Sequence, residues 1–194
     1  MLKRLVVVAA VVLASGGVGV YLALQSLLPG SNVASFVRSG LWVTSTVTGS
    51  SKADLHTRAY VARIGLLALA PEETTYYHAY ADEHGDPLSS DYIYEVRGKD
   101  IPARWWSITL YNFDSFLIPN TDDRYSVKST TLKREPDGSF VIYLSRQPHD
   151  GNWIATDHGH GMSLALRMYN PPDDIRQKLD KLDLPIIRKV GRAP

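Results

Sequence analysis

The chain has 194 residues, a formal net charge of +1 and no cysteine. The balanced charge excludes the strong positive field that nucleic-acid binding requires, so we expect no nucleic-acid partner. The absence of cysteine excludes disulfides, thiolate-ligated metal centres and thiol catalysis. Eleven tyrosines and four tryptophans favour strands and surfaces that are half polar and half apolar.

An uncharged apolar run, residues 5–28, follows a short basic segment, residues 1–4. As a helix it would be about 36 Å long, enough to cross a hydrocarbon core of about 30 Å. Because no basic residue follows until Arg38, the positive-inside rule predicts a signal anchor with a cytoplasmic N-terminus. We therefore expect a single-pass protein of a bacterial-type inner membrane with a periplasmic C-terminal domain. The alternative is a signal peptide that is cleaved near residues 14–16.

Residues 29–73 are expected to form a connector that contains one helix at about residues 51–69. Ser51 and Asp54 resemble a capping box, and apolar residues then recur at helical spacing until Pro71. This helix is expected to pack its apolar face on the sheet that follows.

Residues 74–192 have the pattern of short strands separated by turns. Strands are predicted at 74–81, 92–97, 105–111, 140–144 and 162–169, with an edge strand at 185–190. Asp137-Gly138 predicts a hairpin turn, and residues 173–182 predict a short amphipathic helix. Since the helix–strand alternation of parallel sheets is missing, we predict a mainly β fold, an antiparallel, jelly-roll-like β-sandwich with one or two packed helices.

The strand region resembles the family called domain of unknown function 1214. The residues that carry the resemblance are Trp106, Ser107, Thr109 and Tyr111; Asn120, Arg124, Tyr125 and Ser126; Asp137, Gly138 and Ser139; Asn152 and Trp153; Leu166, Arg167, Tyr169 and Pro171; and, in an opening hairpin, Tyr80, Asp82, Gly85, Pro87, Leu88 and Tyr92. The match runs from about residue 75 to residue 190, although Ile154-Ala155 replaces the Leu-Pro expected after Asn-Trp. The resemblance implies a β-sandwich or jelly-roll-like fold and no established reaction.

Three histidines, His149, His158 and His160, are candidate metal ligands. If residues 158–160 form a strand, two imidazoles face the same side, and a divalent ion binds such nitrogen ligands. The glycines at 159 and 161 instead indicate a solvated turn, which is the interpretation we prefer. We expect no cofactor unless this cluster holds a divalent metal.

Two arginine–tyrosine pairs are candidate ligand-binding residues: Arg124 with Tyr125, and Arg167 with Tyr169. Their guanidinium groups could bind an anionic ligand bidentately in a pocket. The alternative, which we favour, is that they form ion pairs within the fold. The partners available for such pairs are Asp114, Asp122, Asp123 and Glu95.

Trp106 and Trp153 are expected in the core, with contact to a ligand as the alternative. The chain lacks a nucleophile elbow, a phosphate-binding loop, a dinucleotide fingerprint and a zinc-protease motif. We therefore expect a non-enzymatic module, tethered to the membrane, that binds an envelope ligand or a protein partner. The alternatives are a metal-assisted hydrolase that uses the three histidines and a structural subunit of a membrane assembly.

Overall fold

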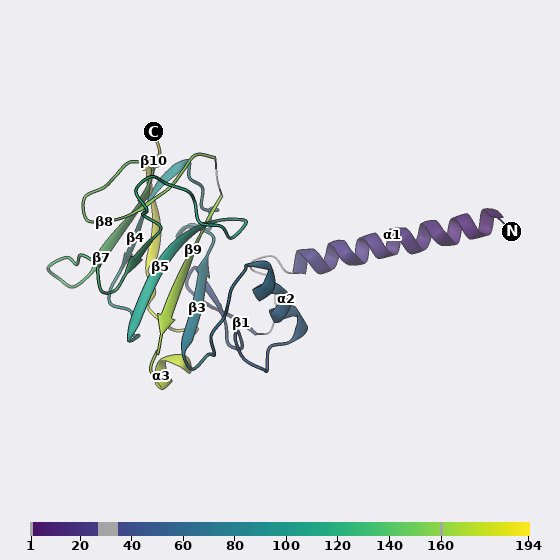
Figure 1. Cartoon of the computed structure of the whole chain (residues 1–194), viewed down its shortest axis with the longest axis horizontal. Helices are drawn as coiled ribbons and strands as arrows, with labels where there is room; N and C mark the ends of the chain where they lie inside the picture. Colours follow the sequence, from purple (N-terminus) through teal and green to yellow (C-terminus); the bar gives the residue numbers. More distant parts are fainter. Residues whose placement is uncertain (1, 27–34, 160) are drawn as a thin grey trace. The chain divides into compact units, whose positions relative to one another are not determined.

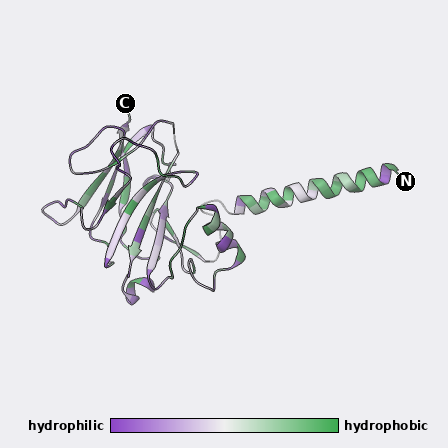
Figure 2. Ribbon diagram, viewed as in Figure 1, coloured by the Kyte–Doolittle hydropathy of each residue, from purple (hydrophilic) through white to green (hydrophobic). Residues whose placement is uncertain are grey.

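The structure, a computed structural model, describes residues 2–26, 35–159 and 161–194, and the chain divides into two units. The first unit, residues 1–33, contains one described element, helix α1 (Leu2–Ser26). It is long and apolar enough to cross a membrane, and Figure 2 shows hydrophobic residues along most of its length. The predicted apolar helix is therefore confirmed as a helix, and its last two predicted residues, 27–28, lie outside the described residues.

The second unit, residues 34–194, contains two β-sheets (Figure 1). The six-stranded sheet has the order β1 (Phe36–Ser39), β2 (Trp42–Ser45), β3 (Thr74–Ala79), β9 (Met162–Tyr169), β5 (Trp105–Asn112) and β6 (Ser126–Lys128). The four-stranded sheet has the order β10 (Ile186–Arg192), β4 (Tyr92–Gly98), β7 (Phe140–Ser145) and β8 (Asn152–Ala155). The predicted mainly β fold with a sandwich-like arrangement is confirmed, and β10 lies at a sheet edge as expected.

One strand pair departs from the antiparallel arrangement that we expected, because β7 and β8 are parallel. Parallel neighbours usually need a connection of a dozen or more residues, yet only residues 146–151 separate these two strands. The connection can be short because the chain has to return only from Ser145, the end of β7, to the level of Ile142, where β8 begins at Asn152. The Asn152 side chain then holds β8 in place by donating to the Val141 carbonyl at 2.9 Å and accepting from the Lys133 N–H at 2.8 Å.

The core lies between the two sheets. Side chains alternate between the faces of a strand, so every second residue of β5 and β9 enters this core. The core residues from these two strands are Trp106, Ile108, Leu110, Met162, Leu164, Leu166 and Met168. The intervening residues of the same strands therefore point to the outer face of the six-stranded sheet.

Helix α2 (Leu55–Arg63) is shorter than the helix that we predicted at 51–69. Its N-cap is Asp54, whose side chain accepts from the Thr57 N–H at 2.7 Å, and not the residue three positions earlier. The helix ends early because Gly65 follows in a left-handed conformation with φ 64°, which stops the α-helical ladder. The apolar periodicity beyond this point belongs to a loop.

Two further segments differ from their predictions. Helix α3 (Asp173–Arg176) covers only the beginning of the helix predicted at 173–182. The predicted turn at Asp137-Gly138 is present, with Gly138 at φ 81°, but it leads into β7 from a segment that is not a strand.

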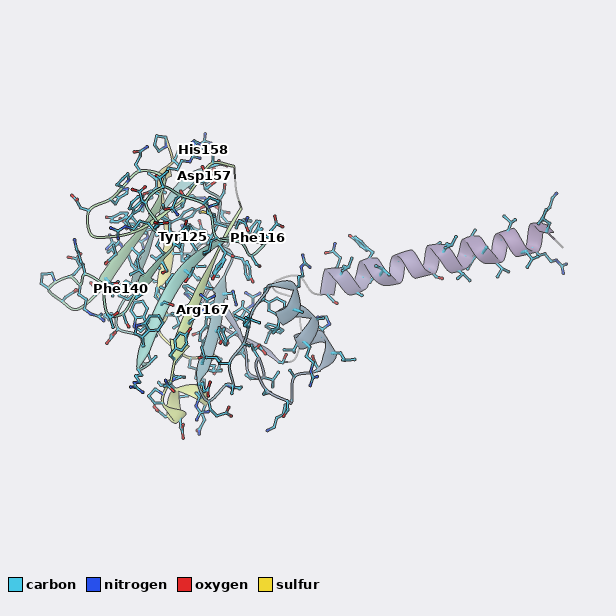
Figure 3. The ribbon with its side chains drawn as sticks, in the orientation of Figure 1. Phe116, Tyr125, Phe140, Asp157, His158 and Arg167 are labelled. Carbon is cyan, nitrogen blue, oxygen red and sulfur yellow. The ribbon has the colours of Figure 1, made fainter. Side chains whose placement is uncertain are left out.

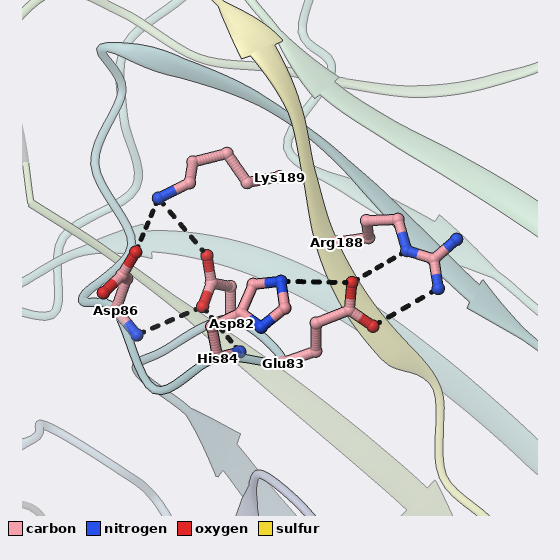
Figure 4. Close-up of polar contacts among 6 residues, drawn as sticks. All are labelled: Asp82, Glu83, His84, Asp86, Arg188 and Lys189. Carbon is pink, nitrogen blue, oxygen red and sulfur yellow. Dashed lines mark hydrogen bonds and ion pairs between the residues drawn. The ribbon is translucent and has the colours of Figure 1, made fainter.

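A cluster of ion pairs fastens the edge strand β10 to the turn that follows β3 (Figure 4). Lys189 Nζ lies 2.7 Å from Asp86 Oδ2 and 3.7 Å from the buried Asp82 Oδ2, and Arg188 Nε lies 2.8 Å from Glu83 Oε1. The hydrogen bond from Arg188 lowers the pKa of Glu83, and the hydrogen bond from Lys189 lowers the pKa of Asp86. These ion pairs join β10 to the turn, so the cluster acts as a structural clamp.

Candidate functional site

A polar patch lies on the outer face of the six-stranded sheet, where β3, β9 and β5 run side by side. The strand register forms rows across these strands: Tyr76, Arg167 and Ser107; His78, Ala165 and Thr109; and Ser163 beside Tyr111. A cavity of about 70 Å³ opens here. Its lining consists of His78, Tyr80, Tyr111, Ser115, Ser163, Arg167 and the loop 64–66, and we call it the Arg167 pocket.

Arg167 is the charged group of this pocket, and its side chain runs along the sheet rather than away from it. The register places Arg167 beside Ser107, yet its guanidinium donates to Thr109 Oγ1 at 3.2 Å and to Tyr111 Oη at 2.8 Å. Both acceptors lie further along β5, so the side chain must pass over Ala165, the cross-strand partner of Thr109. Because Ala165 has only a methyl group, it leaves room for this course.

The partners of Arg167 are neutral. The guanidinium carbon lies 5.5 Å from the centre of the Tyr111 ring, which adds a cation–π contact to the two hydroxyl hydrogen bonds. Among the described residues, no carboxylate oxygen lies within 4.0 Å of Arg167. The acidic partners that we expected do not pair with it, and Glu95 instead binds Arg97 at 2.7 Å. A half-buried guanidinium thus has no carboxylate counter-ion among the described residues.

His78 forms the wall of the pocket on the β3 side. Burial, together with the positive charge of Arg167, lowers the pKa of His78 to about 4, so the imidazole is neutral at neutral pH. Its Nε2 is buried and has no hydrogen-bond partner within the described part of the chain. The imidazole stacks at 6.2 Å on the ring of Tyr80. A neutral imidazole offers one donor and one acceptor, so His78 adds polarity to the pocket without charge.

Tyr80 connects the pocket to helix α2. Its hydroxyl lies 3.0 Å from the hydroxyl of Tyr60, and the Tyr60 ring makes an edge contact with Phe36 of β1 at 4.9 Å. Burial raises the pKa of both tyrosines, so both hydroxyls keep their protons. The pocket therefore combines one cation with neutral hydrogen-bonding groups, an arrangement that suits an anion.

Of the four predicted arginine and tyrosine residues, the structure brings only Arg167 into this pocket. Arg124 is exposed, and the adjacent Tyr125 contributes its carbonyl oxygen to the N–H of Leu110 at 3.1 Å. Tyr169 packs its ring against Trp105 with the centroids 5.1 Å apart. Figure 3 shows Tyr125 and Arg167 at separate levels of the six-stranded sheet.

The two predicted tryptophans are buried. Trp106 is 1% exposed and packs against Phe140 with the ring centres 5.3 Å apart. Trp153 is 6% exposed, and its Nε1 donates to the Ser145 carbonyl at 3.0 Å. Neither lines the Arg167 pocket. Their placement agrees with the core position that we expected, and contact with a ligand stays a prediction.

The three histidines of the predicted metal cluster are not all described. His149 stacks on Tyr143 with the ring centres 4.3 Å apart, and the His158 N–H donates to Asp157 Oδ1 at 2.7 Å. His160 lies outside the described residues. Figure 3 shows Asp157 and His158 at one end of the sandwich, away from Arg167. Within residues 2–26, 35–159 and 161–194, no three His, Asp or Glu side chains are placed to hold a metal, and the cluster stays a prediction.

Most of the residues that surround Arg167 were not predicted from the sequence. His78 and Tyr80 follow the outward-facing alternation of the strand predicted at 74–81, and this signal was available. Thr109 and Tyr111, like Arg167, are among the residues that carry the family resemblance, but they have no charge and were not predicted as site residues. The register between β5 and β9 is what unites them.

Comparisons with known proteins find a family and solved structures that resemble this chain. The family model described as "Protein of unknown function (DUF1214)" matches residues 73–173, a range that contains His78, Tyr111 and Arg167. The VPA0106 protein from Vibrio parahaemolyticus is 26% identical, with a TM-score of 0.59 over 70% of this chain and 35% of that chain. An uncharacterized protein from Burkholderia cenocepacia is 18% identical, with a TM-score of 0.46 over 61% of this chain and 30% of that chain. This chain thus spans about a third of the length of these solved structures. No curated protein matches.

Proposed function

This chain belongs to the DUF1214 family, and we propose that its β-sandwich domain is a binding module that holds the anionic group of a small ligand at Arg167. The observation that carries the proposal is the half-buried guanidinium, which has two hydroxyl groups and an aromatic ring as partners and no carboxylate among the described residues.

The electrostatic argument rests on the cost of burying a charge. A cation that is partly removed from water loses hydration, and neutral hydroxyl groups recover only part of that loss. Two of the five N–H donors of Arg167 are used by Thr109 and Tyr111, so donors remain for a ligand. A hydrogen bond between a guanidinium and a carboxylate contributes about 1.5–3 kcal/mol, which makes a carboxylate or a similar oxyanion the preferred occupant.

The size of the pocket limits the ligand. One water molecule needs about 10–15 Å³ of such volume, so the cavity of about 70 Å³ has room for about five to seven non-hydrogen atoms. Neutral His78 and the hydroxyl of Ser163 line the same cavity and offer hydrogen bonds to a second polar group. The best match is a carboxylic acid of two to four carbons that carries a hydroxyl group.

The proposal includes a tether to the membrane. Helix α1 would anchor the chain in a bacterial-type inner membrane, with the basic residues Lys3 and Arg4 in the cytoplasm and the sandwich in the periplasm. Protease added to spheroplasts should then digest the sandwich while a tag at the N-terminus stays protected. A mature protein that starts near residue 16 would refute the anchor and leave the pocket unaffected.

Binding can be tested by ligand-observed NMR on the full chain in detergent, with glycolate, acetate and inorganic phosphate as probes. Replacement of the guanidinium in Arg167→Gln should weaken glycolate binding at least about 10-fold, since at least one charge-assisted hydrogen bond is lost. Arg124→Gln is the matched control, because it removes the same charge from an exposed position outside the pocket.

The probes separate the parts of the proposal. Glycolate should bind more tightly than acetate, because only glycolate can also bond with His78 or Ser163. Tighter binding of phosphate would keep an anion site but replace the carboxylate as its ligand. Equal affinities of the Arg167→Gln and Arg124→Gln variants would refute the site.

A further inference from the structure

A second cavity lies at the beginning of β3, between the segments 45–52 and 70–76. Its volume of about 490 Å³ falls within the range of about 300–1,000 Å³ that small-molecule sites occupy. It shares no lining residue with the Arg167 pocket. We call it the hydroxyl groove.

The groove exists because the ladder between β2 and β3 is short. Only two residue pairs join these strands, Val43 with His78 and Thr44 with Tyr77. Beyond them β2 ends at Ser45 and the chain leaves the sheet, while at this same end β3 extends further, as far as Thr74. The space that the missing ladder leaves is the groove.

A glycine packed against backbone gives the groove a fixed wall. Gly49 has φ 80°, and a Cβ atom placed on it would lie 1.9 Å from the carbonyl oxygen of Leu69. The Tyr76 hydroxyl accepts from the N–H of the same Leu69 at 2.9 Å. The segment 45–52 is therefore packed directly on the segment that leads into β3, and the cavity is formed before a ligand arrives.

Hydroxyl groups dominate the lining. Eight of the sixteen described lining residues are Ser, Thr or Tyr, among them Ser45, Thr48, Ser50, Ser51, Thr74 and Thr75. Each hydroxyl can both donate and accept a hydrogen bond. The charged lining residues are Lys52, Arg176 and Glu72, and this mixture of signs provides no strong field for a polyanion.

Two polar atoms of the lining residues are buried and unpaired. Thr74 Oγ1 and Arg176 Nε have no hydrogen-bond partner within the described part of the chain. Another nitrogen of Arg176 is held by Asp173, so the guanidinium has a fixed position while its Nε stays available. An unpaired buried polar group is unfavourable because it has lost its hydration without gaining a partner, and a ligand with hydroxyl groups would supply that partner.

We propose that the hydroxyl groove is a second binding site and that its ligand is a saccharide. A sugar presents several hydroxyls at close spacing, each of which can donate and accept, and this matches the lining without requiring a net charge. The site lies largely outside the segment that matches the family, at residues 45–52, 70–72, 176 and 179, so it would be a property of this chain rather than of the shared sandwich.

The test uses saturation-transfer NMR on the full chain in a detergent without a sugar head group, with cellobiose and chitobiose as probes at millimolar concentration. Wild type should transfer saturation to at least one disaccharide. Ser51→Trp places an indole in the groove from an exposed position and should abolish the transfer. Thr130→Trp, also at an exposed hydroxyl residue but outside the groove, is the control and should bind as wild type does.

Thr74→Val provides the second measurement. It removes the unpaired hydroxyl but keeps the shape of the side chain, so binding should weaken about 5- to 10-fold while the unfolding temperature stays equal or rises. A lower unfolding temperature with unchanged binding would give Thr74 a structural role and overturn the proposal. Absence of transfer to both disaccharides, or equal transfer by the Ser51→Trp and Thr130→Trp variants, would overturn it as well. Arg167→Gln should leave this binding intact, which separates the two sites.

Discussion

The hydroxyl groups of Tyr60 and Tyr80 are each other's partners, at 3.0 Å, and join helix α2 to the wall of the Arg167 pocket. Replacing one of them by Phe keeps both rings but leaves the other hydroxyl without a partner. Tyr60 is 7% exposed, so the Tyr80→Phe variant should leave a stranded hydroxyl that costs about 2 kcal/mol. The side chain of Tyr80 is half-buried and thus more exposed than that of Tyr60, so Tyr60→Phe should cost less, about 1 kcal/mol.

The double variant Tyr60→Phe/Tyr80→Phe is the informative member of this set. Removing both hydroxyls leaves none stranded, so the double change should cost at most about 1 kcal/mol, well below the sum of the single changes. Unfolding of the sandwich in guanidinium chloride, followed by tryptophan fluorescence, gives these free energies directly. Additive costs, with a double variant near 3 kcal/mol, would show that the hydroxyls do not depend on each other and would refute the reasoning.

Two further predictions concern backbone and charge. Gly49→Ala should destabilise the domain by about 3 kcal/mol or more, because the added Cβ meets the Leu69 carbonyl. Gly40→Ala, at φ 59° in open space, is the control and should cost about 1–2 kcal/mol in the same unfolding assay. Equal costs would contradict the clash. The ion pairs lower the pKa of Glu83 and Asp86, so their contribution to the stability of the domain should be fully present near neutral pH. This contribution should decrease below about pH 4.5 for Glu83 and pH 3.8 for Asp86, as acid protonates the carboxylates. The Glu83→Gln/Asp86→Asn variant should lose part of this acid dependence in thermal melts across pH 2–6, and an unchanged profile would exclude the clamp as its source.

The strands were predictable because their signal is local. Alternation and turn residues lie within the segment that they describe, so the strands at 92–98, 105–112 and 140–145 were identified nearly to their ends. β8 was missed because four residues are too few to show a period, and because its parallel pairing depends on the Asn152 side chain. The extent of α2 was wrong because the apolar spacing continues past Gly65, where the backbone conformation, not the pattern, ends the helix.

The candidate site was predictable only in part. Arg167 could be selected by residue type alone, since a guanidinium on a strand needs partners. Which partners it has depends on register: Thr109 lies 58 residues away in the chain and meets it only because β5 pairs with β9. The same register explains why no acidic residue in the described part of the chain serves as its counter-ion, because Thr109 and Tyr111, the β5 residues that its side chain reaches, carry hydroxyls.

Ala165 has no functional group, yet it lies beside Thr109 on the outer face, at the level that the Arg167 side chain reaches along the sheet. A larger side chain at this position, such as leucine, should compete with the guanidinium for the same space, with every polar residue of the site still in place. The binding properties of such a surface can therefore be changed at a position that takes no part in the chemistry.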